Sequence, residues 1–412
     1  MTRFWHPFAD MGLVAERGEL VLERGEGVWV WDEQGRRYLD AAAGLWYCMA
    51  GYGRDEIAAA AAEQMRRLAA YSAYADLVTR PTADVAERIA GLSPLDDAVV
   101  FLTSGGAEAI ETAAKLSRRY FSLTGEPQRT VLVSRERAYH GMGAFGTSLA
   151  GHEIFREGIE APVTDVVHVP WDSAPALRET IEGLGAERVA AFFCEPVIGA
   201  GGVLAPPPGY LEEVRAICRE AGCLFVADEV ITGFGRVGNW FASDRFRLDP
   251  DLITFAKGST SGYLPLGGVI ASQRVAQPFW AGGVVFRQGY TYSGHASVAA
   301  ASLANLEILE REELPGRALE LEGELAEALS PLADHPLVSE IRAGIGVMAA
   351  VQLVDPALAD TAVAAARDHG VLTRTLLGGA LQISPALVIE RSDLDELAAG
   401  LAGALDACAA TV

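Results

Sequence analysis

The chain has 412 residues, half of them hydrophobic, and a formal net charge of −22. This length predicts two domains, or one large domain with a smaller partner. The acidic excess argues against nucleic acid and anionic membrane surfaces as partners. A membrane helix needs about 18 consecutive apolar residues, and no stretch of the sequence is that long. Without an apolar signal segment, and with five cysteines that form no metal-ligand cluster, we expect a cytoplasmic protein with reduced thiols and no bound metal.

Short apolar runs alternate with amphipathic helices through the middle of the chain. This alternation predicts an α/β fold with a mostly parallel sheet covered on both faces. The expected strands span Ala98–Leu102, Thr130–Ser134, Val166–Val169, Val189–Cys194, Cys223–Asp228, Leu252–Phe255 and Leu266–Ala271. The expected helices between them span Arg54–Ala70, Ala107–Phe121, Ala174–Leu184 and Gly209–Ala221.

The two ends of the chain differ from this middle part. The segment Val28–Asp40 predicts two short strands around a turn, and the C-terminal part predicts long Ala/Leu/Glu helices beside short strands. The expected elements there are helices at Ser297–Arg311, Arg317–Leu329, Asp360–His369 and Ser392–Ala409, and strands near Val338–Arg342 and Val347–Leu353. We therefore expect a large domain of residues 45–294 and a smaller α+β domain formed by residues 1–44 and 295–412.

Lysine is rare in this chain: Lys115 and Lys257 are the only two, and the other basic residues are arginine. An amine can lose its proton and form a Schiff base, which a guanidinium cannot do. Lys115 lies on an expected amphipathic helix, where a solvated charge is ordinary. Lys257 instead ends an apolar strand and precedes a loop of small residues, so we take it as the candidate for covalent amine chemistry.

Three further groups follow expected strands, at the edge where open α/β sheets bind ligands. Gly105, Gly106 and Ala107 open a helix whose free N–H groups suit a phosphate, although a tight turn needs glycine in any case. Tyr139 and His140 lie in a glycine-rich loop and either face a flat ligand or pack that loop. Asp228 ends a buried strand, where a carboxylate needs a cation or donors that a structural partner would also supply.

Taken together with Lys257, these groups suit one ligand. They match a phosphate at the glycine turn, a flat ring at Tyr139, a cationic nitrogen at Asp228 and an aldehyde at Lys257. Those are the parts of pyridoxal 5′-phosphate, so the sequence predicts an enzyme that uses this cofactor.

Nearly the whole chain resembles the class III, or omega, aminotransferases of pyridoxal-phosphate fold type I. The resemblance rests on His6-Pro7-Phe8, Gly44-Leu45-Trp46, Gly51-Tyr52-Gly53-Arg54, Ser104 through Ala109, Tyr139-His140-Gly141, Glu195-Pro196-Val197, Asp228-Glu229-Val230, Gly233-Phe234-Gly235-Arg236, Phe255-Ala256-Lys257-Gly258, Pro265-Leu266-Gly267 and Thr291-Tyr292-Ser293-Gly294-His295.

This resemblance implies a role for each site residue. Lys257 would form the Schiff base and Asp228 would bind the ring nitrogen. The remaining cofactor contacts would come from Gly105, Gly106, Ala107, Tyr139, His140, Glu195 and Val230, with Tyr139 and Val230 on the two faces of the ring. Tyr290 and Thr291 would reach the phosphate of a neighbouring subunit, which implies a homodimer, or a tetramer, with shared active sites.

Two departures from the family pattern narrow the expected activity. Ala107 stands where the family often has serine, so a hydroxyl contact is lost. Ala200 stands where many 2-oxoglutarate enzymes have a glutamate that holds the substrate-carboxylate arginine aside. Here that arginine looks like Arg374, which we expect to swing outward when the amine has no α-carboxylate. With Gly44-Leu45-Trp46, this resembles the amine:pyruvate and β-alanine:pyruvate branch, in which Trp46 and Tyr47 line the substrate pocket.

We therefore expect an aminotransferase that moves an amino group from an amine or ω-amino acid to a 2-oxo acid, with pyruvate as the expected acceptor. Lys257 would remove the proton next to the nitrogen, and Arg374 would bind the oxo acid. A 2-oxoglutarate acceptor, a same-fold aminomutase, racemase or decarboxylase, and a non-enzymatic binding protein are the alternatives. The sequence does not specify the amine donor.

Overall fold

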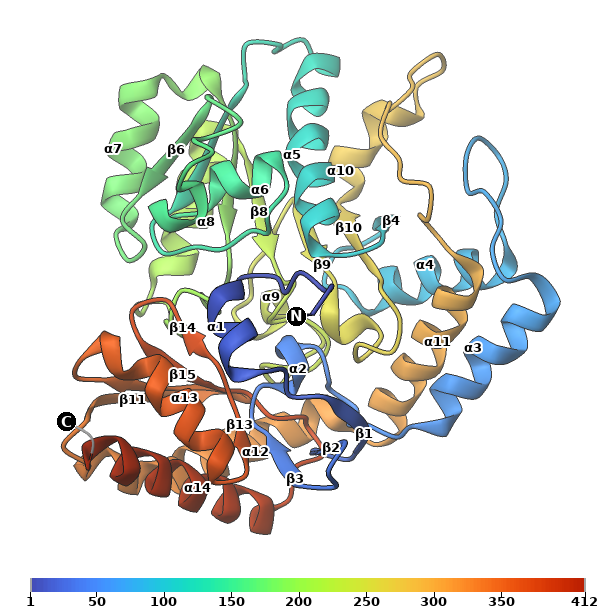
Figure 1. Ribbon diagram of the computed structural model, residues 1–412. Helices are drawn as coiled ribbons and strands as arrows, with labels where there is room; N and C mark the ends of the chain where they lie inside the picture. The colour runs from blue at the N-terminus through green and yellow to red at the C-terminus, as the bar shows by residue number, and fades with distance from the viewer. Residues whose placement is uncertain (1, 411–412) are drawn as a thin grey trace.

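The computed structural model describes residues 2–410, and its largest element is a seven-stranded sheet (Figure 1). The strand order is β4-β10-β9-β8-β7-β5-β6. Only β10 runs antiparallel to its neighbours within this sheet, so the predicted mostly parallel sheet is confirmed. The strands span Val99–Thr103 (β4), Val131–Arg135 (β5), Val166–Val169 (β6), Val189–Cys194 (β7), Leu224–Asp228 (β8), Leu252–Phe255 (β9) and Gly267–Ala271 (β10).

Successive residues of these strands enter two different cores on opposite faces of the sheet. In β8, Leu224 and Val226 join one apolar cluster, and Phe225 and Ala227 join another. Strands that are buried on both faces read as continuous apolar runs, which explains why all seven were predictable. One face is covered by α5 (Gly106–Leu123) and α6 (Ala144–Leu149), the other by α7 (Ala174–Leu184) and α8 (Tyr210–Ala221).

Two four-stranded sheets are built from the chain ends and lie in the lower half of the view in Figure 1. The first has the order β1-β2-β3-β13 and the second β11-β12-β15-β14. Their strands span Leu22–Glu26 (β1), Trp29–Asp32 (β2), Arg37–Asp40 (β3), Val338–Ile345 (β11), Met348–Leu353 (β12), Val371–Leu372 (β13), Thr375–Leu376 (β14) and Ala380–Ile383 (β15). Because β3 pairs with β13 in parallel, strands from both chain ends share a sheet.

The remaining helices connect these sheets. They span Met11–Arg17 (α1), Ala43–Trp46 (α2), Asp55–Leu68 (α3), Arg80–Leu92 (α4), Ala242–Arg245 (α9), Gln273–Ala276 (α10), Ala296–Arg311 (α11), Leu314–Leu329 (α12), Ala359–Asp368 (α13) and Arg391–Ala409 (α14). Helix α11 packs against α3 and α4, although we assigned it to the small domain, so the boundary near residue 294 stays a prediction (Figure 1). Within residues 2–410, every helix is too short or too polar to cross a membrane.

Candidate active site

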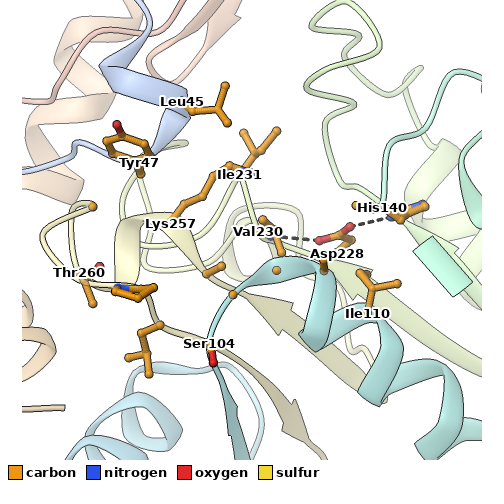
Figure 2. Close-up of a pocket in the computed structure, with 18 of the residues that line it drawn as sticks. Leu45, Tyr47, Ser104, Ile110, His140, Asp228, Val230, Ile231, Lys257 and Thr260 are labelled. Carbon is orange, nitrogen blue, oxygen red and sulfur yellow. Dashed lines mark hydrogen bonds and ion pairs between the residues drawn. The ribbon is translucent and has the colours of Figure 1, made fainter. Parts of the chain in front are cut away.

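Most of the residues predicted to bind the cofactor meet at one edge of the seven-stranded sheet. Strands β4, β5, β7, β8 and β9 run in the same direction, so their carboxyl ends share that edge. The residues that follow these ends line one cavity of about 570 Å³, shown in part in Figure 2. They are Gly105, Gly106, Ala107, Tyr139, His140, Glu195, Asp228, Val230 and Lys257.

Asp228 is the most strongly hydrogen-bonded side chain of the cavity and is only 4 % exposed. Its Oδ2 lies 2.6 Å from His140 Nδ1, and its Oδ1 accepts from the Val230 N–H at 3.1 Å and the Thr254 hydroxyl at 2.9 Å (Figure 2). A carboxylate has about four acceptor positions, so one stays open to an N–H of a ligand. Within residues 2–410, His140 Nε2 is buried without a hydrogen-bond partner, and because an ionised carboxylate only accepts, Nδ1 is the nitrogen that donates to Asp228.

The glycine turn before α5 leaves backbone donors open. No side chain caps this helix at Gly105, so the first-turn N–H groups face the cavity. A Cβ at Gly106 would lie 2.9 Å from Val230 Cγ1, so only glycine fits there. Gly141 has φ of +85°, and a Cβ there would lie 3.0 Å from the Ala107 Cα. These two glycines allow the turn to approach Val230 and the Tyr139 loop closely.

Glu195 connects two loops of the site. It is 3 % exposed, and its carboxylate accepts from the Tyr139 N–H at 3.0 Å and the Gly199 N–H at 2.9 Å. Burial raises the pKa of Glu195, while the nearby His140 opposes that rise. Glu195 therefore fixes the backbone that presents the Tyr139 ring to the cavity.

Lys257 lies two residues after the last residue of β9 and opens a short 3₁₀ turn, Lys257–Ser259, with φ of +45°. The left-handed conformation costs a non-glycine residue on the order of 1–2 kcal/mol, and here it points the amine into the cavity (Figure 2). Burial lowers the pKa of Lys257 to about 8, although the carboxylates of Asp228 and Glu195 oppose the shift. A larger neutral fraction at physiological pH is what a nucleophilic amine needs.

Arg374 lies beside the cavity, outside its lining residues. Burial raises the pKa of the Tyr139 phenol, and the positive charge of Arg374 opposes that rise. Burial also lowers the pKa of Arg374. Within residues 2–410, the Arg374 guanidinium has no hydrogen-bond or ion-pair partner, so it is available to a ligand carboxylate.

The structure places Leu45 and Tyr47 in the cavity wall, as Figure 2 shows, but not Trp46. Trp46 is 1 % exposed and packs in an apolar cluster behind the wall, which corrects the expectation that it lines the pocket. The physical reason is the backbone, because φ is positive at Ala43, Gly44 and Trp46. This conformation turns the indole inward and leaves Leu45 facing the cavity.

The apolar wall also contains residues that the sequence analysis missed. Met142, Tyr263 and Leu264 line the cavity beside Tyr47. A Cβ at Gly262 would lie 2.2 Å from the Tyr47 ring, so this glycine fixes how closely the ring approaches. The position of Tyr263, just after the small-residue loop that begins at Lys257, was a signal that could have identified it.

Tyr290 and Thr291 do not line the cavity of their own chain. The Tyr290 hydroxyl donates to the Glu108 carbonyl of α5 at 3.1 Å, and the Thr291 side chain is exposed. Their expected contact is with the phosphate in a second subunit, so this assignment stays a prediction.

The groups present fit pyridoxal phosphate. The open N–H groups of the glycine turn can donate to a phosphate. The Asp228 carboxylate has an acceptor position left for a ring N–H, and the partly neutral amine of Lys257 can react with an aldehyde. Tyr139 and Val230 are an aromatic and an aliphatic side chain that suit the two faces of a flat ring.

Comparisons with known proteins point the same way. A family model described as aminotransferase class-III matches residues 14–405. The putrescine–pyruvate aminotransferase of Pseudomonas aeruginosa is 38 % identical, with 98 % of this chain and 94 % of that protein covered. The diaminobutyrate–2-oxoglutarate transaminase of Halomonas elongata is 36 % identical, with coverages of 92 % and 88 %. The crystal structure of an (S)-enantioselective omega-transaminase from Thermomicrobium roseum matches with a TM-score of 0.94 and 40 % identity, covering 98 % of this chain and 96 % of that chain.

Proposed function

The chain belongs to the class III aminotransferases, which depend on pyridoxal phosphate, and from this premise we propose that it moves an amino group from an amine or ω-amino acid to pyruvate. The proposal rests mainly on one observation: the Lys257 amine, the Asp228 carboxylate and the glycine turn line the same cavity.

Each residue has a role in this proposal. The first turn of α5 would bind the phosphate and Asp228 would bind the ring nitrogen. Tyr139 and Val230 would pack against the two faces of the ring. When bound, the cofactor supplies a carbonyl carbon for amines and a ring that accepts electron density. Lys257 would be the residue that holds that carbon, and its Nζ, once displaced by the donor amine, would be the base for the proton on the carbon next to the donor nitrogen. His140 keeps the Asp228 carboxylate oriented through their 2.6 Å contact.

The composition of the cavity wall favours pyruvate over 2-oxoglutarate. No arginine is among the lining residues, and Lys257 is the only lysine there. Arg374 lies near the wall and can bind one carboxylate. A second carboxylate, as in 2-oxoglutarate, would be desolvated without a cationic partner, which costs several kcal/mol. An amine panel assayed with each acceptor tests this preference, and equal rates with both acceptors would contradict it.

Arg374→Ala should impair the oxo-acid half-reaction much more than the amine half-reaction. Pyruvate presents a carboxylate that arginine binds bidentately, and losing that contact should raise the pyruvate KM by about ten- to a hundredfold. A simple amine has no carboxylate, so its half-reaction should proceed at a similar rate. Stopped-flow absorbance times the two halves separately. Arg367→Ala, on the exposed face of α13, is the matched control and should change neither. Equal slowing of both halves would show that Arg374 only supports the pocket.

The lowered pKa of Lys257 should be visible in cofactor loading. Only the neutral amine attacks an aldehyde, and its fraction rises as pH passes the pKa. With a pKa of about 8, covalent loading of the cofactor-free protein should therefore rise with a midpoint near that pH. An ordinary lysine would give a midpoint about two units higher. Initial loading rates measured from neutral to alkaline pH decide between the two, with Lys115→Arg as a control that should leave the profile unchanged.

We further propose that the active form is a homodimer, or a higher oligomer, in the cytoplasm. Thr291 and Tyr292 are exposed on a glycine-flanked segment next to α5, and Tyr292 is 68 % exposed. Aromatic side chains are enriched in subunit interfaces, so we expect a second subunit to cover this exposed tyrosine.

Subunit mixing tests the shared site. Lys257→Ala and Thr291→Tyr chains should each be inactive as homodimers, because each defect then affects both sites. A mixed dimer carries both defects in one site and none in the other, so exchange should restore about half the activity per mixed dimer. If exchange is verified by mass and no activity returns, Thr291 does not complete a partner site.

A further inference from the structure

A second cleft, of about 380 Å³, lies outside the proposed active site. One wall comes from the segments that follow β5, β6 and β7, and the other from β11 and β12. The lining residues are Arg137, Trp171, Val197, Val203, Leu204, Ala205, Glu340, Arg342, Ala343, Ile345 and Met348. None of these residues lines the cavity that contains Lys257.

Two loops near the cleft are in tight backbone contact. A Cβ at Gly201 would lie only 2.1 Å from the Arg137 carbonyl oxygen, so the loops that carry these residues pack main chain against main chain. The two cavities share no lining residue. A ligand in the cleft is therefore in a different site from one that contacts Lys257.

The charges of the cleft do not cancel. Arg342 is fully engaged, since it donates to the Glu340 carboxylate at 2.7 Å, the Gln352 side-chain oxygen at 2.8 Å and the Gly202 carbonyl at 2.7 Å. The Arg137 guanidinium, in contrast, has no hydrogen-bond or ion-pair partner within residues 2–410. Arg137 is exposed at the cleft, and the one carboxylate among the lining residues, that of Glu340, pairs with Arg342, so the Arg137 guanidinium is open to an anion.

Part of the cleft wall is apolar. Val197 and Met348 are buried to 1 % exposure, and Val203 to 5 %, and the partly buried indole of Trp171 lies among the lining groups. An apolar wall with one uncompensated guanidinium suits a small anion with an apolar body. A phosphate or sulfate would leave the apolar wall unused, and a neutral apolar molecule would leave the guanidinium unpaired.

We propose that this cleft binds a small organic carboxylate with an apolar body, held by an ion pair to Arg137. The proposal does not depend on the transamination chemistry, because the binding step needs neither the cofactor nor turnover.

Benzoate is a suitable probe, since it carries neither an amine nor an oxo group. Arg374 is the expected carboxylate partner in the active site, so titration calorimetry is done on the cofactor-loaded Arg374→Ala protein. We expect one benzoate per chain in this background. Adding Arg137→Gln should weaken binding at least about tenfold, as should replacing benzoate by the neutral benzamide, because each removes a charge-assisted pair.

A second variant tests the location without changing a charge. Ala205 is exposed at the cleft wall, and Ala205→Trp should fill the space and abolish benzoate binding while cofactor loading and the unfolding temperature stay unchanged. Arg367→Gln on α13 is the control and should bind benzoate normally. The proposal is overturned if the Arg374→Ala protein binds no benzoate, if benzamide binds equally well, or if neither Arg137→Gln nor Ala205→Trp weakens binding.

Discussion

Lys257→Ala is expected to abolish the covalent attachment of the cofactor and to lower turnover by at least about 10⁴-fold. General acid–base catalysis alone contributes up to about that factor, and here the same amine is also the point of attachment. Borohydride reduction followed by peptide mapping measures the attachment, and alanine formation from pyruvate measures turnover.

Lys115→Ala is the matched control for this substitution. Its side chain is exposed on α5, where its amine donates to Gln288 at 2.9 Å. It should retain full covalent loading and activity. A reduced cofactor label on Lys115, or undiminished attachment in Lys257→Ala, would overturn the assignment of the whole site.

Asp228→Asn should retain the fold but lose more than about a hundredfold in turnover. The amide can still accept from the Thr254 hydroxyl and the Val230 N–H, but it has no charge to stabilise a protonated ring nitrogen. Losing the partner of a buried cation costs about 3–5 kcal/mol, and about 1.4 kcal/mol corresponds to tenfold in rate.

The exposed Asp249 provides the control, and Asp249→Asn should leave turnover unchanged. Asp228→Glu keeps the charge and should recover part of the activity if charge is the property that matters. Near-normal turnover of Asp228→Asn would mean that this carboxylate, with its His140 contact, only stabilises the fold.

Much of the central fold was predictable because the relevant signal is local. The seven core strands are short apolar runs, and both of their faces are buried, so residues such as Phe225 and Val226 read alike in the sequence. Strands β13 and β14 have two residues each and carry too short a pattern to be recognised. Helix α4 was missed although Pro81 in its first turn is a helix-start signal.

The candidate site was predictable where its parts follow strand ends, and less so where side chains from distant segments meet. The need of Asp228 for a partner could be inferred from its burial, but His140, 88 residues away, could not be identified as that partner. Trp46 was assigned to the wrong side of the wall because positive φ values at Ala43 and Trp46 are invisible in the sequence.

The most direct test of the proposed function is the balance of amino groups in one reaction. Cofactor-loaded protein is incubated with an amine and pyruvate, and the amine, its carbonyl product and alanine are quantified together, with Lys257→Ala as the blank. An aminotransferase acting on pyruvate predicts one alanine and one carbonyl product for each amine consumed. Without pyruvate it predicts no alanine and at most one carbonyl product per cofactor. Consumption of the amine without alanine, whether by rearrangement within one molecule or by loss of carbon dioxide, would contradict that account.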